Sequence, residues 1–503
     1  MPTSHAFPVR LRVWIALILA LTGLGVAGRL FLRPTAPERV LILASHLEDG
    51  PRDLGPGMAV LLADLLEVLT GATVIQGQDP PVPDQLAKLP SSLRLLRFTG
   101  RREGDNLTLA LAWTTVADLQ AGRPWRIDAP QATEPQRALE HLVQHWPLTL
   151  RHRSLEDLIP RTPSRFWRLL DGLCIQDDHA ASARLPESWA LAQEEPGCAT
   201  AWTVLGDHLY RSLWVNPDQA GIGLSSRTHQ VFQRVMTLSP GHPRATFLWS
   251  LMLTDTGNQS LALKRLQEAL RLRPDCPDLY IGVAYACRTS GLLEGARKAL
   301  VRRSDLLGSL DSPSSWVAET TYLYLGDLAA FHRELTRAES LHPDASILFY
   351  RGYLALIQGA PQASYQHFRD GCSTDMTPAP FLDLCRAYTA HLEGRDAEGL
   401  RELRRVDEVR GKLRIPDGEW TFKEAEAYAL LGDADRAMEC ATRAFVQGFS
   451  CAAWYETSPF LEPVRKHPRW PSLHRNIRER QAELEAEFPP TSFEPRGAFG
   501  PLN

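Results

Sequence analysis

The sequence lacks the short motifs that mark the common enzyme classes. It has no GxSxG nucleophile turn, no Walker A loop, no HExxH pair and no GxGxxG preceded by a strand. No CxxC pair occurs among the eight cysteines, which argues against a zinc site made of thiolates. The sequence therefore predicts no catalytic residues, no cofactor and no metal, and an uncharacterised enzyme is only a minor alternative.

An excess of charge of either sign is also absent. The 503 residues include 55 lysines and arginines against 59 aspartates and glutamates, so the net charge is −4. A nucleic-acid-binding protein would carry a basic excess, so we expect no nucleic acid among the partners. The apolar content of 44% is typical of a globular chain, and the length implies two or more domains.

Long uncharged apolar runs are missing except near the amino terminus. Residues 13–28 carry no charge, and Leu30 to Leu32 extend the run past Arg29. The segment 13–32 is long enough for a transmembrane anchor, with Arg29 snorkelling to the interface and residues 1–12 forming a short cytoplasmic segment. The alternative is a cleaved signal peptide. Both interpretations place the bulk of the chain outside the cytoplasm.

All eight cysteines lie between Cys174 and Cys451. An exported protein can oxidise its thiols, and the even count permits full pairing. Cys276 and Cys287 are expected on one helix, about 16 Å apart, which is too far for a disulfide. Cys372 and Cys385 fall on successive helices and form the best candidate bridge. The favoured interpretation is nevertheless that the cysteines are small buried side chains.

Glycines recur at a nearly constant interval in the second half of the chain. Successive members are separated by 33 to 38 residues: Gly257, Gly291, Gly326, Gly359, Gly394 and Gly432. In most units a small residue follows five positions later and a larger apolar residue nine positions later. A glycine can end a first helix in the left-handed conformation, and small residues let a second helix approach closely. One such hairpin cannot bury its apolar face alone, so the hairpins must stack.

This pattern resembles the tetratricopeptide-repeat family, whose unit is a helix–turn–helix of about 34 residues. The resemblance implies a mainly α fold, with an α-solenoid over residues 163–448. Residues 449–488 are predicted to form a closing cap and a long helix, and residues 489–503 a disordered tail.

The hydrophobic pattern of residues 39–148 has a different period from that of the repeats, and it predicts a small α/β domain. Val40 to Ser45 predict a buried strand, and a helix follows that starts near Pro56 and ends at Gly71. A hairpin is expected to turn at Gly104 and Asp105. The remaining predicted elements are strands at 72–77 and 122–130, a short helix within 80–89 and a helix that begins at Pro135.

This segment resembles the TolB amino-terminal-type α/β domain. The resemblance is carried by the strand at Val40 to Ser45 and by matching positions in the hairpin region: Gly100, Arg102, Gly104, Asp105, Leu107, Gly122 and Trp125. In bacteria this domain is often found between a membrane helix and tetratricopeptide repeats. The resemblance implies a single-pass protein of the bacterial inner membrane with its bulk in the periplasm, or else an exported soluble periplasmic protein. Such chains often carry a signalling output domain before the membrane helix, and only residues 1–12 occupy that place here.

His141 and His145 are four residues apart and are expected on one face of a helix. That spacing suits a metal, but the sequence places no carboxylate partner beside them. We therefore predict a surface or packing role for both.

The first helix of each repeat is expected to line the concave face of the solenoid. Two positions on it, one turn apart, carry a row of mostly aromatic side chains, and these are the predicted partner-binding residues: Phe247, Ile281, Tyr285, Trp316, Phe349, Tyr353, Leu384, Tyr388 and Phe422. Such a row suits an extended or helical peptide, because aromatic residues dominate interface hot spots. The competing interpretation is that these side chains pack between repeats.

The sequence thus predicts a non-enzymatic scaffold of the bacterial cell envelope that binds a protein or peptide in the concave groove. The alternative is a ligand-sensing or signalling accessory protein that uses its α/β domain.

Overall fold

The computed structural model describes residues 38–43, 45–50, 52–76, 89–129, 133–150, 154–175, 177–215, 223–308, 316–341, 345–373, 379–410 and 417–494. The predicted anchor or signal segment, 13–32, lies outside these residues, as does most of the short helix predicted within 80–89. Across the described residues, none of the helices has both the length and the apolar character needed to cross a membrane.

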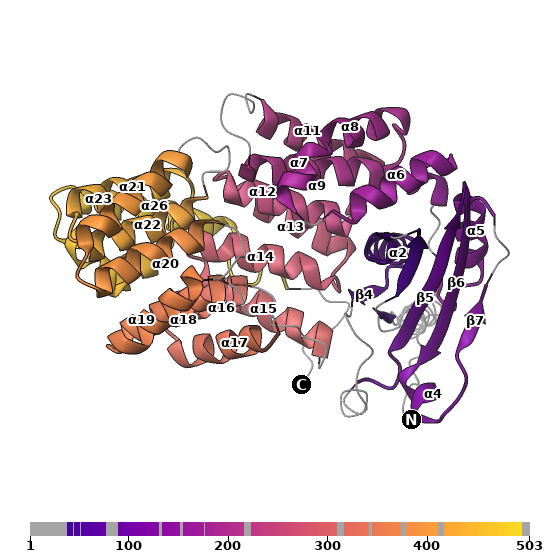
Figure 1. The fold of residues 1–503 in the computed structure, drawn as a ribbon, viewed down its shortest axis with the longest axis horizontal. Helices are drawn as coiled ribbons and strands as arrows, with labels where there is room; N and C mark the ends of the chain where they lie inside the picture. The colour runs from indigo at the N-terminus through magenta and orange to yellow at the C-terminus, as the bar shows by residue number, and fades with distance from the viewer. Residues whose placement is uncertain are drawn as a thin grey trace, which may run out of the picture.

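The amino-terminal part is a seven-stranded sheet with helices (Figure 1). Its elements are β1 (Arg39–Ile42), β2 (His46–Asp49), β3 (Arg52–Asp53), α2 (Gly55–Thr70), β4 (Thr73–Gln76), β5 (Arg94–Glu103), β6 (Asn106–Thr115), α4 (Val116–Gln120), β7 (Arg126–Asp128) and α5 (Pro135–Gln144). One edge of β5 pairs in parallel with β1 and then β2, and the other edge pairs antiparallel with β6. β4 lies beside β1, and β7 lies beside β6. The predicted α/β region and its hairpin are therefore present, whereas the short polar strands β2 and β3 were not predicted.

Both faces of the sheet are covered. On one face the alternating residues of β6 are buried: Leu107, Leu109, Leu111 and Trp113. They belong to the same hydrophobic core as α2, α5 and several solenoid helices. On the other face Leu41, Leu95 and Val116 form a second cluster, which Leu307 of the solenoid completes. The solenoid thus contributes to the core on both sides of the sheet.

The rest of the chain is helical. The first helices are η1 (Leu155–Asp157), α6 (Pro163–Leu173), α7 (Asp178–Ala183), α8 (Leu185–Glu194), α9 (Ala199–Val215) and α11 (Leu224–Leu238). Six helix pairs follow: α12 (Pro243–Asp255) with α13 (Gln259–Leu272), α14 (Pro277–Thr289) with α15 (Leu293–Leu307), α16 (Trp316–Tyr324) with α17 (Leu328–Leu341), α18 (Ala345–Ile357) with α19 (Pro361–Cys372), α20 (Ala379–Leu392) with α21 (Asp396–Arg410), and α22 (Gly418–Leu430) with α23 (Ala434–Val446). The chain then forms α24 (Ala452–Thr457), η3 (Pro459–Leu461), α25 (Glu462–Arg465) and α26 (Trp470–Glu487).

The repeat glycines behave as the spacing predicts. Between the two helices of each pair, all six adopt positive φ angles, from +72° to +86°. In this region of backbone space a side chain with a Cβ is strained, so glycine ends the first helix at little cost. The predicted solenoid of stacked hairpins is therefore present.

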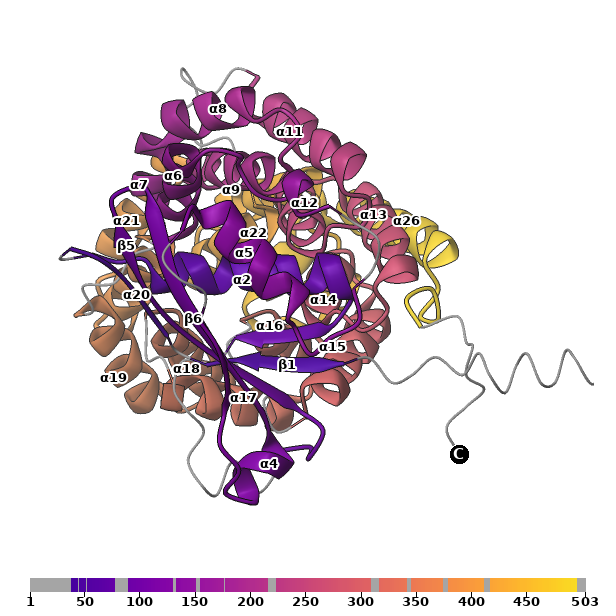
Figure 2. The ribbon, with the colours of Figure 1, turned by 90° about the vertical axis from the view of Figure 1, so that its right-hand side faces the viewer.

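The solenoid coils so that its last units meet its middle units. Viewed end-on, the helix pairs wind around a common axis (Figure 2). The backbone amide of Asp417, before α22, donates to the carbonyl of Asp255 at 3.2 Å, and that of Ser450 donates to the carbonyl of Thr289 at 2.8 Å. Gln259 Nε2 also donates to the carbonyl of Gly448, at 3.0 Å. Units more than a hundred residues apart in sequence are therefore direct neighbours.

Helix α2 docks onto the solenoid and lies across its open end in the end-on view (Figure 2). Gly57 is pressed against α6, so closely that an added Cβ would lie 2.7 Å from the carbonyl oxygen of Leu170. Further along α2, Arg244 of α12 reaches the Asp64 carboxylate at 3.5 Å. Arg273 donates to the carbonyl of Val68 at 3.3 Å. The α/β region and the solenoid therefore share an interior and form one folded body.

The predicted disordered tail needs correction over its first residues. Phe493 is buried and stacks on Phe488, with ring centroids 6.2 Å apart. Gln267 of α13 donates to the carbonyl of Ser492 at 3.2 Å, and Lys298 of α15 pairs with Glu494 at 2.9 Å. Residues 489–494 are held because the two phenylalanines cover apolar surface of α13 and α15. Residues 495–503 lie outside the described part.

The eight cysteines are free thiols. Six are buried, and Cys174 and Cys372 are half-buried. The candidate Cys372–Cys385 bridge is not formed; Cys372 Sγ lies 3.8 Å from the Thr389 hydroxyl instead. The interpretation of the cysteines as small buried side chains fits this arrangement.

The close approach at Gly57 predicts the effect of a single methyl group. Gly57→Ala should lower the free energy of unfolding by about 1–3 kcal/mol, because α2 must move away from α6 to accommodate the Cβ. This loss is expected although alanine is favoured over glycine within a helix. Gly197→Ala is the matched control, since an added Cβ there meets nothing within 4 Å. Urea denaturation of both variants measures the difference, and equal stabilities would show that α2 is not tightly docked.

Candidate functional site

The residues predicted to line the concave groove are mostly buried. Six are no more than 2% exposed: Tyr285, Phe349, Tyr353, Leu384, Tyr388 and Phe422. Phe247 and Ile281 are half-buried. Trp316 begins α16, and its side chain lies outside the described part. The six buried side chains do not form an exposed contact surface, which corrects the expectation of an open aromatic row.

The chain itself fills the inner face. Phe449, which follows α23, packs against Phe422 with ring centroids 4.7 Å apart. The ring centroids of Trp454, on α24, and Tyr324 are 5.3 Å apart, and those of Phe460, in η3, and Tyr353 are 4.9 Å apart. Offset and edge-on aromatic contacts of this kind stabilise a core beyond simple burial of area. Tyr353 and Phe422 of the predicted row thus pack against the carboxyl-terminal part of the same chain.

Polar groups along the axis are paired across the coil. The buried carboxylate of Glu426, on α22, accepts hydrogen bonds from Tyr353 Oη at 2.7 Å and from Lys423 Nζ at 2.9 Å. It also accepts from Trp454 Nε1 at 3.0 Å and from Ser458 Oγ at 2.6 Å. A buried carboxylate is tolerated only when its oxygens are satisfied in this way. Glu426 therefore organises the inner face as a structural centre.

A second buried ion pair joins α14 to α22. Arg288 is fully buried, and its Nη2 lies 2.5 Å from Glu419 Oε2. Tyr324 Oη donates to the other oxygen of Glu419 at 2.5 Å. The Arg288 guanidinium also lies over the ring of Tyr285, 5.0 Å from its centroid. These contacts explain why Tyr285 is buried, because its ring covers a charge that has no access to water.

Asp255 lies at the end of α12, where the segment before α22 meets it. Tyr210 Oη donates to its carboxylate at 2.6 Å, and Tyr285 Oη donates to the other oxygen. Burial, and next the negative charge of Asp417, raise the pKa of Asp255 to about 8. The carboxyl group is therefore largely protonated at neutral pH.

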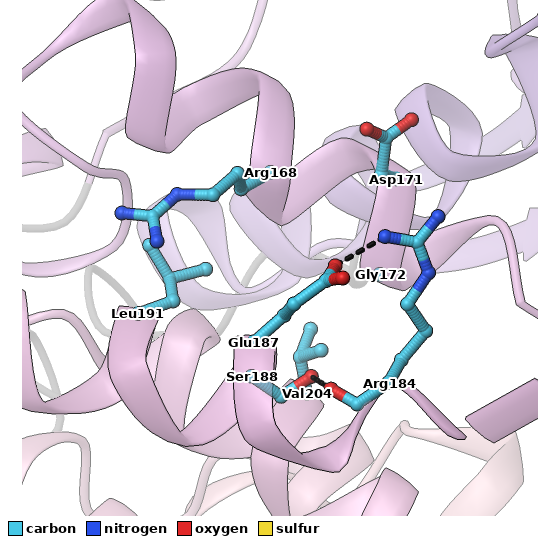
Figure 3. A pocket seen from close by; sticks show the side chains of 8 residues that line it. All are labelled: Arg168, Asp171, Gly172, Arg184, Glu187, Ser188, Leu191 and Val204. Carbon is cyan, nitrogen blue, oxygen red and sulfur yellow. Dashed lines mark hydrogen bonds and ion pairs between the residues drawn. The ribbon is translucent and has the colours of Figure 1, made fainter. Parts of the chain in front are cut away.

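The described residues also contain a small pocket of about 70 Å³ between α6, α8 and α9 (Figure 3). It is lined by Arg168, Asp171, Gly172, Arg184, Glu187, Ser188, Leu191 and Val204. The Arg184 guanidinium is paired with Glu187, as the figure shows.

A serine–histidine pair lies at this pocket. Ser188 Oγ is 2.7 Å from His208 Nδ1, while His208 Nε2 is 3.1 Å from the carbonyl of Gly172. Burial lowers the pKa of His208, which favours a neutral ring that donates from Nε2 and accepts at Nδ1. A catalytic triad would place a carboxylate where Gly172 offers a carbonyl. Ser188 is moreover buried and also bonds the Arg184 carbonyl at 3.2 Å, so the pair joins α6, α8 and α9. Sequence reasoning missed this pair because its members lie on different helices.

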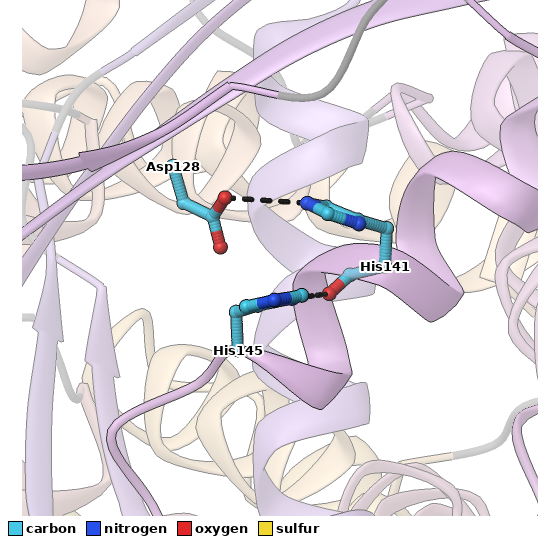
Figure 4. Close-up of side chains that lie close together, drawn as sticks. All are labelled: Asp128, His141 and His145. Atoms are coloured by element: carbon cyan, nitrogen blue, oxygen red, sulfur yellow. Dashed lines mark hydrogen bonds and ion pairs between the residues drawn. The ribbon is translucent and has the colours of Figure 1, made fainter.

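A third cluster consists of Asp128, His141 and His145 (Figure 4). One ligand atom of each residue lies within 4.8 Å of those of the other two. The two histidine rings of α5 face each other with centroids 4.2 Å apart, and His141 Nε2 lies 3.4 Å from Asp128 Oδ1 on β7. The structure therefore supplies the carboxylate partner that the sequence did not place. The sequence did not place Asp128 beside the histidines because β7 pairs with β6 and α5 packs against β6, so the two elements meet only in the folded structure.

The buried pair between α14 and α22 predicts a large loss of stability when one partner is removed. Arg288→Met should lower the free energy of unfolding by about 3–5 kcal/mol, because Glu419 is left as a buried charge without a counterion. The double variant Arg288→Met/Glu419→Gln should recover part of this loss in a double-mutant cycle measured by chemical denaturation. If the two substitutions are additive, the pair does not couple α14 to α22.

The pKa of Asp255 predicts a pH dependence. Its folded pKa lies above the ordinary value of 3.8, so its contribution to stability is present at low pH and is lost as the pH rises through about 8. Between pH 6.5 and 8 this carboxyl should reduce the free energy of unfolding by up to about 1.4 kcal/mol per pH unit. Asp255→Asn keeps an oxygen for the two tyrosines and cannot ionise. The free energy of unfolding of this variant, measured by chemical denaturation, should therefore fall less between pH 6.5 and 8. An unchanged decline in the variant would assign the effect to other groups.

Comparison with known proteins supports the repeat assignment. Residues 253–306, which cover α13, α14 and most of α15, match the family model described as tetratricopeptide repeat. No curated protein matches the chain.

Three solved structures are similar in part. The Cut9–Hcn1 hetero-tetramer of the APC/C matches with 12% identity over 72% of this chain and 80% of that one, at a TM-score of 0.36. A tetratricopeptide repeat protein from Parabacteroides merdae matches with 17% identity over 47% and 91%, at a TM-score of 0.28. The TPR domain of P58(IPK) matches with 13% identity over 64% and 99%, at a TM-score of 0.18. At these scores the likeness is too loose to transfer geometry, and the description of the solenoid rests on its own helices and on the family match over residues 253–306.

Proposed function

We propose that this protein is a non-enzymatic scaffold that binds another protein. The observation that carries the proposal is the stack of helix pairs with the tetratricopeptide-repeat match at its centre, since this type of fold is typical of protein–protein interaction scaffolds. The Ser188–His208 pair does not support a competing hydrolase. His208 bonds the carbonyl of Gly172 where a triad would have a carboxylate, and the Ser188 hydroxyl also bonds the carbonyl of Arg184.

The partner surface is best sought where the inner face is not fully covered. Phe247 on α12 and Ile281 on α14 occupy equivalent positions in adjacent repeats, and both are half-buried. The equivalent residues of later repeats, such as Phe349 and Phe422, are fully buried by the chain itself. Among the side chains of the predicted row that the structure describes, those on α12 and α14 are therefore the ones that remain partly accessible to a partner.

The envelope location belongs to the same proposal. The apolar segment 13–32 would hold the protein at the bacterial inner membrane with its bulk in the periplasm, or would direct its export as a soluble periplasmic protein. The resemblance of residues 39–148 to the TolB amino-terminal-type domain supports this placement.

A second candidate function is a ligand-sensing or signalling accessory role for the α/β region. The shared core favours it, because a ligand that shifts α2 would act directly on α6 and α12. Such a role would use the solenoid as the part that reports the bound state.

The proposal is tested by capturing partners from the envelope. Crosslinking in a native bacterial host, followed by membrane fractionation, should recover the chain with a specific protein in the envelope fraction. Phe247→Ala/Ile281→Ala should reduce the recovered partner by about tenfold or more, since truncating a hot-spot side chain typically costs at least about 2 kcal/mol. Val301→Ala, at an exposed position of the second helix α15, is the matched control and should retain the partner.

Circular dichroism of both variants must first show that they fold. Equal recovery with both variants would exclude this surface, and recovery only in the cytoplasmic fraction would exclude the envelope location.

A further inference from the structure

We propose that Asp128, His141 and His145 form a binding site for a divalent transition metal, with Zn²⁺ as the preferred ion. The site lies on the α/β region, outside the solenoid, and is independent of the proposed scaffold function. Two neutral imidazoles with one carboxylate are a donor set that zinc takes in proteins, often with water in the fourth position.

The histidine spacing fixes the first two ligands. His141 lies in the last turn of α5 and His145 is its C-cap residue, one helical turn later, so both rings project from the same side, as Figure 4 shows. His145 Nδ1 lies 2.6 Å from the backbone carbonyl of His141. That contact requires Nδ1 to carry the hydrogen, which leaves Nε2 with a free lone pair for a metal. Carbonyl groups commonly orient zinc-binding histidines in this way.

The carboxylate distance matches coordination better than a hydrogen bond. His141 Nε2 and Asp128 Oδ1 are 3.4 Å apart, which exceeds the usual hydrogen-bond range of about 2.7–3.2 Å. Zinc–ligand distances of about 2.0–2.2 Å place two tetrahedral ligands about 3.3–3.6 Å apart. The pair is therefore already spaced as two ligands of one ion, and a small rotation of side chains would bring in His145.

The surroundings fit an accessible ion. His141 and His145 are both exposed, so water or another ligand can complete the coordination. The Arg126 guanidinium contacts the backbone carbonyl of His145, at 3.4 Å, and not an imidazole nitrogen. β7 is a three-residue edge strand, and a metal bound to Asp128 would fasten it to α5. Hard cations such as Mg²⁺ prefer all-oxygen sites and should bind poorly here.

Calorimetric titration of the full chain with ZnCl₂ tests the site, with MgCl₂ as the comparison ion. We expect one more zinc equivalent for the unaltered protein than for His141→Gln/His145→Gln. Asp128→Asn should weaken that equivalent by at least about tenfold, because even outer-shell changes cost roughly 10–100-fold in metal affinity. His391→Gln is the matched control, since His391 is also paired with a single carboxylate, Asp396, at 2.7 Å but has no second histidine.

Thermal denaturation gives a second readout that does not depend on counting ions. Zinc should raise the melting temperature of the unaltered protein and of His391→Gln, but not of the double histidine variant. The double histidine variant changes two exposed side chains, so it should remain folded in the absence of metal. Identical zinc stoichiometry in the unaltered protein and the double variant would overturn the proposal, as would equal binding of magnesium and zinc.

Discussion

Closure of the helical coil is the constraint on which the rest of the structure depends. Helix α22, near the end of the solenoid, meets α14 through the Arg288–Glu419 pair, and the amide of Asp417 before α22 meets the carbonyl of Asp255 on α12. The charges of Arg288 and Glu419 are tolerated at this depth because they pair with each other, and removing one of them leaves an uncompensated charge. The closed form is therefore specified by a few polar contacts and stabilised by the aromatic side chains that close over them.

Closure also changes what the repeats offer to other molecules. In an open solenoid the first helices of all units line one continuous surface. Here Phe449, Trp454 and Phe460 of the same chain pack against that surface. Tyr353 and the tyrosines at the same position of other repeats, Tyr285 and Tyr388, are therefore buried core residues. The binding surface of the proposed scaffold is the edge of the inner face near α12 and α14, together with the outer helices. A scaffold of this shape would present a short binding surface in place of a long groove.

The α/β region is built into the same body. Gly57, Asp64 and Val68 of α2 contact three different solenoid helices or their caps, and the sheet shares apolar clusters with the solenoid on both faces. A region joined in this way does not form a freely hinged module, because separating it would expose Asp64 and the apolar face of α2 together. The cluster of Asp128, His141 and His145 includes two exposed histidines, so a bound ion would be reached from solvent.

Local physical rules acting along the chain determined much of this protein. The positive φ of Gly257 and its five equivalents, the hairpin turn at Gly104 and the alternation from Leu107 to Trp113 all follow from short-range sterics and from the periods of helix and strand. Only the tertiary structure decided whether Tyr353 would face solvent or Phe460, because the radius of the coil depends on contacts between units more than a hundred residues apart. The same holds for Asp128, which joins His141 through strand pairing, and for Ser188, which joins His208 across two helices. Sequence spacing encodes neighbours along one element, whereas these pairs arise from how separate elements pack.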